Sequence, residues 1–234
     1  MDLKHYESIS KIFDYPEENY YEVVSKAIAD IGMRYPEASL ALENFLEILP
    51  MNISDLQELY SKSFEVQAVT SLDVGYVLYG DDYQRGVVLV NLSKEHIKAE
   101  NDCGKELADH LPNLLRLLPK IDNAEVRDEM VTMLIATAVE KMMDEFSSSA
   151  LKAKDKLYQK QYKTLIVPKF PVTIFLHPLA ALYKILDSDF DLIKDNKPFG
   201  DESFIGHLKG ELEIQEGKQS SNSCGVGGCG TGSC

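Results

Sequence analysis

The stretch Glu106-Leu-Ala-Asp-His-Leu-Pro-Asn-Leu-Leu-Arg-Leu-Leu118 decides the fold class. Its leucines recur at intervals of three and four residues, which places them on one face of an α-helix. The leucines of this apolar stripe are Leu107, Leu111, Leu114, Leu115 and Leu118. On the same helix, Glu106 would share a second face with Asp109 or His110. The spacing therefore predicts a helix that starts near Glu106 and buries its leucines.

The same helical spacing recurs on both sides of that stretch. Apolar residues at intervals of three and four occupy positions 42–49 and 131–142. Ser54 and Gln57 have the spacing of a capping box at a helix start. Alternation of apolar and polar residues, as in a strand, never persists. These patterns predict an all-α fold, a single-domain helical bundle.

Two stretches break the helical pattern. Residues 163–178 contain three prolines and many β-branched residues, so we expect an extended connection there, followed by a helix near 179–186. Beyond about residue 197 the pattern decays into a Gly/Ser-rich end that is too low in complexity to form a core. We therefore predict a helical domain over residues 1–197 and a disordered C-terminal tail over residues 198–234.

The charge of the chain limits its partners. It has 24 basic and 38 acidic residues, a net charge of -14, so its surface repels phosphate backbones and nucleic acid is not an expected partner. Such a surface favours solubility and suits a basic peptide. The most apolar segment, 165–183, is interrupted by prolines and a lysine, and the first residues do not resemble a secretory signal. We expect a cytoplasmic protein without stable membrane insertion.

The cysteines are concentrated at one end of the chain. Cys224, Cys229 and Cys234 recur every five residues in the Gly/Ser-rich tail, whereas Cys103 stands alone. This distribution is not typical of a disulfide-linked secreted domain. Three thiolates on a flexible backbone suit transient binding of a soft metal or a cluster, although a zinc site usually has four ligands. A solvated tail with incidental thiols is the alternative.

Two clusters of polar and aromatic residues are candidates for function. Glu106, Asp109 and His110 are able to bind a divalent metal or act as acid and base, or else to stabilise a helix start. The second cluster, residues 72–86, places aromatic side chains and Arg85 before a helix that begins near Tyr83. It is expected either to pack at a helix junction or to line a groove, with Arg85 paired to Asp109 or Glu106.

The two clusters together resemble a known family. A Leu-Asp…Tyr-Gly…Arg-Gly block at residues 72–86 precedes a Glu-Leu-x-Asp-His-Leu-Pro-x-Leu-Leu block at residues 106–115. This pairing resembles the NarJ/TorD superfamily of redox-enzyme maturation chaperones, and the position of Pro112 resembles the nitrate reductase (NarJ) branch. The resemblance runs from the first helix to about Leu186, and its specific part is residues 72–118.

The resemblance implies an assembly chaperone rather than an enzyme. Such a protein binds the N-terminal segment of an apo molybdoenzyme catalytic subunit and holds it while the molybdenum cofactor is inserted, and it needs no cofactor of its own. The expected client is of the nitrate or nitrite oxidoreductase type, with a subunit that carries a twin-arginine leader as the alternative. The partner-binding residues that the resemblance implies are Leu72, Tyr76, Tyr79, Gly80, Arg85, Glu106, Asp109, His110 and Pro112.

The chain departs from the family pattern in two ways, and other functions stay open. Ala108 stands where the family usually has a proline, a change that a helix start accepts, and the Cys-rich tail is not part of the pattern. The tail raises the alternative of a metal or iron–sulfur delivery protein. Glu106, Asp109 and His110 raise that of a metal-dependent hydrolase. In the chaperone reading, Asp109 and His110 hold a helix junction and transfer no protons.

Overall fold

The computed structural model describes residues 2–192, and this part of the chain is helical without β-strands. The helices are α1 (His5–Ser10), η1 (Lys11–Phe13), α2 (Tyr20–Ile31), α3 (Pro36–Ile48), α4 (Ile53–Phe64), α5 (Val74–Tyr79), α6 (Tyr83–Lys98), α7 (Leu111–Leu117), η2 (Leu118–Lys120), α8 (Ala124–Met130), η3 (Val131–Ile135), α9 (Ala136–Glu145), α10 (Ser148–Tyr162), η4 (Val172–Phe175) and α11 (Leu176–Phe190). The prediction of an all-α fold is confirmed. The predicted boundary at residue 197 lies outside the described residues.

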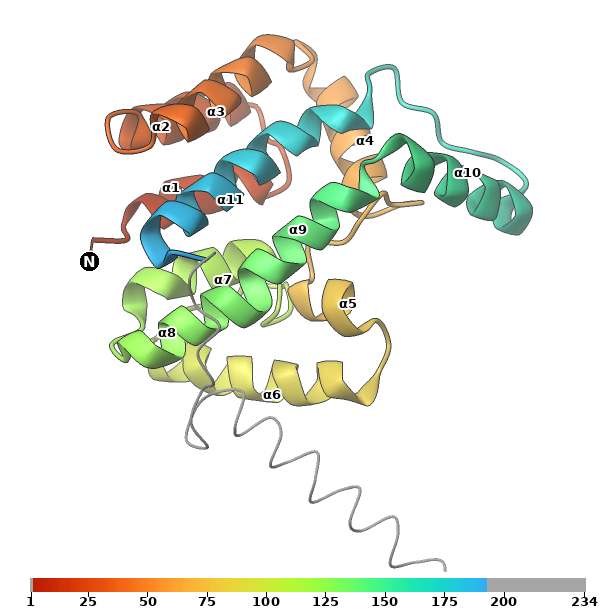
Figure 1. Cartoon of the computed structure of the whole chain (residues 1–234). Coiled ribbons are helices and arrows are strands. Elements are labelled where there is room, and N and C mark those ends of the chain that lie inside the picture. The colour runs from red at the N-terminus through yellow and green to blue at the C-terminus, as the bar shows by residue number, and fades with distance from the viewer. Residues whose placement is uncertain (1, 193–234) are drawn as a thin grey trace, which may run out of the picture.

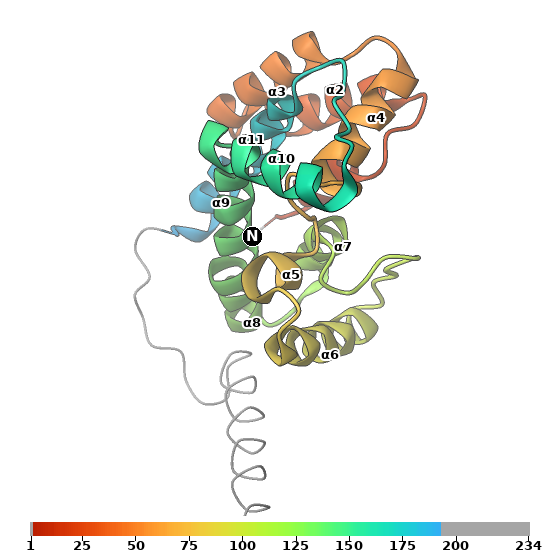
Figure 2. The ribbon, with the colours of Figure 1, turned by 90° about the vertical axis from the view of Figure 1, so that its right-hand side faces the viewer.

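The helices pack around one apolar core (Figures 1 and 2). α11 lies against α3 and α9, and α1 lies between α2 and α7. α8, η3 and α9 form one continuous rod, in which η3 is a turn of π-helix. α5 packs against this rod and against α6. Within the described residues, no helix is both long and apolar enough to cross a membrane.

The apolar stripe predicted for residues 131–142 forms the buried face of that rod. Val131, Leu134, Ile135, Ala138 and Met142 are all fully buried. Their spacing of three and four residues places them on one side of a helix, so the rod contributes to the core along its whole length. The prediction for this segment is confirmed.

Asp189 joins the first and last helices of the described chain. Its carboxylate, only 1 % exposed, accepts hydrogen bonds from the hydroxyls of Tyr6 (3.1 Å) and Tyr35 (2.6 Å) and from Nη2 of Arg34 (2.7 Å), and it lies 3.0 Å from Nε2 of His5. Burial raises the pKa of Asp189, but the bonds from His5 and Tyr35 and the charges of His5 and Arg34 outweigh it, so the net pKa is lowered.

The helix predicted to start near Glu106 is shorter than expected. α7 starts at Leu111, and residues 104–110 form turns, in which His110 N donates to Leu107 O (3.1 Å). The reason is Pro112, because in a helix that extended back to Glu106 its ring would clash with the carbonyl of Ala108, four residues earlier. Leu107 is therefore 49 % exposed rather than part of the buried stripe, and Ala108 lies in a turn rather than at a helix start.

One other local prediction is wrong, and another is right except in its bounds. The residue that caps α4 is Asn52, whose side chain accepts a hydrogen bond from Ser54 N (2.8 Å), so Ser54 and Gln57 do not form a capping box. The extended connection after α10 ends at Pro171, and α11 begins at Leu176 rather than near residue 179. Pro178 lies in the first turn of α11, where the missing N–H of a proline has no intrahelical partner to lose.

Candidate functional site

A short antiparallel bridge joins the two sequence blocks. Val74 N donates to Asp109 O (2.8 Å), and Leu111 N donates to Leu72 O (2.8 Å), so Asp73 lies opposite His110. The bridge fixes the start of α5 against the start of α7. It thereby aligns the side chains of two segments that are distant in the sequence.

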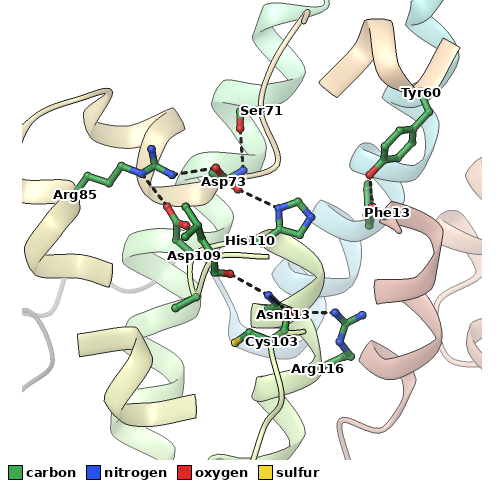
Figure 3. Close-up of polar contacts among 12 residues, drawn as sticks. Phe13, Tyr60, Ser71, Asp73, Arg85, Cys103, Asp109, His110, Asn113 and Arg116 are labelled. Atoms are coloured by element: carbon green, nitrogen blue, oxygen red, sulfur yellow. Dashed lines mark hydrogen bonds and ion pairs between the residues drawn. The ribbon is translucent and has the colours of Figure 1, made fainter. Parts of the chain in front are cut away.

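Arg85, which extends from the first turn of α6, connects both sides of this bridge (Figure 3). Its Nη2 donates to Asp73 Oδ2 (2.9 Å), and its Nε donates to Asp109 Oδ2 (3.2 Å). On the other side of Asp73, Nδ1 of His110 lies 3.0 Å from Oδ1. Because an ionised carboxylate only accepts hydrogen bonds, His110 donates through Nδ1. These four side chains are called the Asp73 network below.

Asp109 is the buried member of the network. The residue has no exposed surface, and its Oδ1 has no hydrogen-bond partner within the described residues. Burial raises the pKa of Asp109, as does the charge of Asp73, while Arg85 opposes the shift. Gly75 makes this packing possible, since a Cβ atom there would lie 2.7 Å from Asp109 Oδ2.

Asp73 has the opposite electrostatic environment. The hydrogen bond from His110 lowers the pKa of Asp73, and the charges of His110 and Arg85 add to this effect against the cost of partial burial. Asp73 therefore stays ionised and keeps Arg85 and His110 in place. The guanidinium of Arg85 also lies 5.3 Å from the centre of the Tyr76 ring, in a cation–π contact.

A second set of polar side chains supports the turns before α7. Nε2 of the buried His96 lies 3.0 Å from Ala108 O, and its Nδ1 pairs with Asn101 (2.9 Å). The side-chain amide of Asn113, also buried, donates to Leu107 O (2.9 Å) and Cys103 O (3.2 Å). The turns before α7 leave these carbonyls without a partner in a helix, and the side chains supply one. The bonds therefore hold the turns in place and keep Asp109 and His110 aligned with Asp73.

Two adjoining cavities open beside the Asp73 network. The main cavity, about 740 Å³, lies among the ends of α4, α5, α9 and α10, and Tyr76 and Arg85 line it. The side cavity, about 280 Å³, is lined by Tyr15, Tyr60 and the network residue His110, among others. The two cavities share the lining residues Phe64, Glu65, Ser71 and Asp73. The network thus forms part of the wall of a two-part groove.

Only some of the predicted site residues line the groove. Those that line a cavity are Leu72, Tyr76, Arg85, Glu106 and His110. Asp109 and Pro112 are buried behind this wall. Tyr79 and Gly80 end α5 and line neither cavity, and Gly80 has a φ of 63°, which favours glycine. The predicted pairing of Arg85 with Asp109 is confirmed, whereas its other partner is Asp73 and not Glu106.

Three residues central to the site were missing from the sequence prediction. Asp73 was quoted in the first block but not assigned a role, although it binds both Arg85 and His110. Gly75 and His96 were not singled out at all. Only the position of Asp73 immediately before an aromatic helical segment was a usable signal, because the contacts of Gly75 and His96 depend on tertiary packing.

The suggested metal and acid–base roles find no matching arrangement in the described residues. The Asp109 carboxylate is turned to Arg85 and the His110 ring to Asp73, while Glu106 is exposed in the turns before them. Between residues 2 and 192, no group of three or more His, Cys, Asp and Glu side chains is arranged to hold a metal ion. Cys224, Cys229 and Cys234 lie outside the described residues.

No protein-family model matches the chain, and no curated protein matches it. Over residues 2–192 the protein is all-α, and it has a groove whose wall includes the Asp73 network.

Proposed function

We propose that this protein is an assembly chaperone for a molybdoenzyme. It binds the N-terminal segment of an apo catalytic subunit, of the nitrate or nitrite oxidoreductase type, and holds that subunit for insertion of the molybdenum cofactor. The observation that carries the proposal is the meeting of the two sequence blocks. The Leu-Asp…Arg-Gly block and the Asp-His-Leu-Pro block lie far apart in the chain, yet they form one network at the wall of one groove.

The chemistry of the network supports a positioning role over catalysis. Asp109 is buried and bonded to Arg85, and the bond between His110 Nδ1 and Asp73 fixes the orientation of the His110 ring. A general base needs access to the proton it removes, which the buried Asp109 lacks. The network instead has the properties of a rigid support, which a binding groove requires in order to present its lining in one arrangement.

The charge of the groove supports a basic partner. The carboxylates that line the two cavities belong to Asp14, Glu65, Asp73, Glu106, Asp144 and Glu145, whereas the lysines and arginines are Arg85, Lys141 and Lys154. The ion pairs of Arg85 with Asp73 and Asp109, of Lys154 with Glu145 (3.0 Å) and of Arg116 with Asp14 (3.3 Å) neutralise part of this charge. Among the described residues, Glu65, Glu106 and Asp144 then stand against Lys141. The groove therefore favours a positively charged segment, which charge complementarity also steers toward it. Phe64 and Tyr76 add apolar surface.

The proposal is tested by maturation of the client in cells that lack this chain. We expect the catalytic subunit of the host's nitrate or nitrite oxidoreductase to accumulate there without molybdenum, and the wild-type chain to restore its molybdenum content. Arg85→Gln removes the centre of the network and is expected to restore little. The matched control is Arg127→Gln in α8, because the Arg127 side chain is 16 % exposed, as is that of Arg85, and lies in an ion pair with Asp128 away from the groove.

The outcomes are clear-cut because both variants remove one partly buried cation. Full molybdenum loading in the absence of the chain, or equal rescue by both variants, would contradict the proposal. The alternative function, metal delivery through the cysteine tail, is tested with a chain truncated after Ser223, which lacks all three tail thiols. The metal content of the client is measured in cells that contain this truncated chain. As a chaperone that acts through its groove, the truncated chain is expected to rescue as well as the full chain.

A further inference from the structure

α10 differs from the other long helices in how it is attached. It spans the 15 residues Ser148–Tyr162, and none of them is buried. Leu157 is 58 % exposed and Tyr162 is 54 % exposed. In Figure 1 α10 extends beyond the end of α9, away from the helices that surround the core, and in Figure 2 it faces the viewer. A helix without buried side chains receives little stabilisation from the hydrophobic effect.

Leu151 is partly buried and packs against the core, and the other contacts that hold α10 in place are mostly polar. The Tyr158 hydroxyl donates to Ala68 O (2.9 Å), Lys154 Nζ donates to Val69 O, and the ammonium group of Lys62 lies 5.3 Å from the centre of the Tyr158 ring. A hydrogen bond of this kind contributes about 1 kcal/mol, and bonds to water replace it when the helix moves outward. Displacement of α10 is therefore inexpensive compared with displacement of a core helix.

Space is present on both sides of α10. The main cavity lies on one side, and an apolar cavity of about 210 Å³ lies between α10 and the connection after it. Both cavities are lined by Gln67, Ala68, Lys154 and Tyr158. α10 starts after Ser147, whose side chain caps it, and it ends at Lys163, whose backbone is left-handed with a φ of 61°. At each end, a residue with a non-helical backbone joins α10 to the rest of the chain.

The inner side of α10 and the opposite rim of the main cavity have complementary characters. Tyr158 and Tyr162 line the cavity from α10. Glu65 and Asp144 line it from the body of the protein, and neither carboxylate forms an ion pair within the described residues. An occupant between them meets the rings of Tyr158 and Tyr162 on one side. On the other side it meets the carboxylates of Glu65 and Asp144, which outnumber the one lysine there that forms no ion pair within the described residues, Lys141. This combination suits a peptide segment with basic side chains along one edge and apolar side chains along the other.

We propose that α10 is the movable half of the binding surface and that it closes Tyr158 and Tyr162 over the client's N-terminal segment. This inference rests on the proposed function, and it adds to it the part of the chain that grips the segment. The free helix stays loosely attached, and the bound segment supplies the apolar surface that α10 lacks in the free protein. Burial of that surface on binding stabilises α10.

The test combines hydrogen exchange with calorimetry on the full chain. The probe is a synthetic peptide of about 20 residues, roughly five helical turns, that reproduces the start of the host's nitrate or nitrite oxidoreductase catalytic subunit. We expect the amides of residues 148–162 to exchange fast in the free chain and at least about tenfold more slowly with the peptide. Tyr158→Ala is expected to weaken peptide binding by about tenfold, as for an aromatic side chain buried at an interface.

The matched control is Leu157→Ala. It removes a neighbouring apolar side chain from the same helix, but Leu157 lines neither cavity. Alanine is the best helix former, so both variants keep α10 helical, and we expect the control to bind as the wild type does. If the wild type binds the peptide while α10 exchange is unchanged and Tyr158→Ala binds equally well, the role of α10 is refuted but the proposed function stands.

Other outcomes overturn different parts of the account. If the wild-type chain binds no such peptide, the proposed function is contradicted, and so is the client's N-terminal segment as the occupant of the groove. Slow exchange of α10 in the free chain that depends on protein concentration would identify a second copy as the occupant and overturn the inference. Slow exchange that disappears when residues 193–234 are removed would identify the chain's own C-terminal segment and overturn it as well.

Discussion

Gly75→Ala is the substitution that tests the packing behind the groove wall most sharply. Gly75 lies buried in α5, and an added Cβ would meet Asp109 Oδ2 at 2.7 Å and Arg85 Cγ at 3.2 Å. The first distance is shorter than real contacts allow, so the Asp109 carboxylate has to move. Its bond with Arg85 is already 3.2 Å long, and further movement breaks it.

The magnitude follows from two opposing terms. A buried carboxylate that loses its hydrogen-bonded cation costs about 3 kcal/mol. Alanine in place of glycine within a helix returns about 1 kcal/mol. We therefore expect Gly75→Ala to lower the free energy of unfolding by about 2 kcal/mol, which moves the urea midpoint down by about 1 M.

Gly86→Ala is the matched control for this prediction. Gly86 lies in the first turns of α6, and a Cβ there would have no neighbouring atom within 4 Å. Only the helix-propensity term applies, so we expect the control to gain up to about 1 kcal/mol. Urea denaturation followed by far-UV circular dichroism measures both variants. If Gly75→Ala is as stable as Gly86→Ala, the close approach of α5 to Asp109 is refuted.

The remaining predictions concern stability away from the groove. Asp189→Asn is expected to lower the free energy of unfolding at pH 7 by about 3 kcal/mol and to weaken its decline below about pH 4, because a carboxylate with a lowered pKa stabilises the fold only while it is ionised. Leu111→Ala is expected to cost about 3 kcal/mol and Leu107→Ala almost nothing, because only Leu111 is buried. Asn52→Ala is expected to cost about 1 kcal/mol, whereas Ser54→Ala leaves stability unchanged.

Each of these three tests has a contradicting result in the same assays. An unchanged acid limb of the pH profile would show that Asp189 is not the ionised anchor of the terminal helices. Equal losses of stability for the two leucine variants would support the longer helix that the leucine spacing predicted. A larger loss of stability for the Ser54 variant than for the Asn52 variant would support the predicted capping box.

The helical class of the fold was predictable from the sequence because helix faces repeat locally. The stripe of residues 131–142 required only the spacing of its own side chains, and it is buried as predicted. The prediction that the leucine stripe begins before residue 111 was wrong, for a reason that the spacing of the leucines does not reveal. Leu107 has the right interval, but Pro112 prevents the helix from extending back to it. Periodicity identifies a face, whereas a single proline determines where the helix starts.

The sequence predicted which residues belong to the candidate site better than it predicted the contacts between them. Arg85, Asp109 and His110 were singled out, and the pairing of Arg85 with Asp109 was anticipated. The role of Asp73 was not, because the antiparallel bridge that places it opposite His110 is a single residue pair with two hydrogen bonds and leaves no strand pattern in the sequence. The closeness of Gly75 to Asp109 likewise depends on how α5 packs, which no local pattern encodes.

We propose that this chain holds the catalytic subunit of a molybdoenzyme before its cofactor is inserted. The most direct measurement is purification of the tagged chain from its native host, with mass spectrometry and metal analysis of the proteins that accompany it. We expect recovery of a catalytic subunit without molybdenum, and loss of that subunit when its N-terminal segment is deleted. Absence of any such subunit, from cells that express one, would contradict the proposed function.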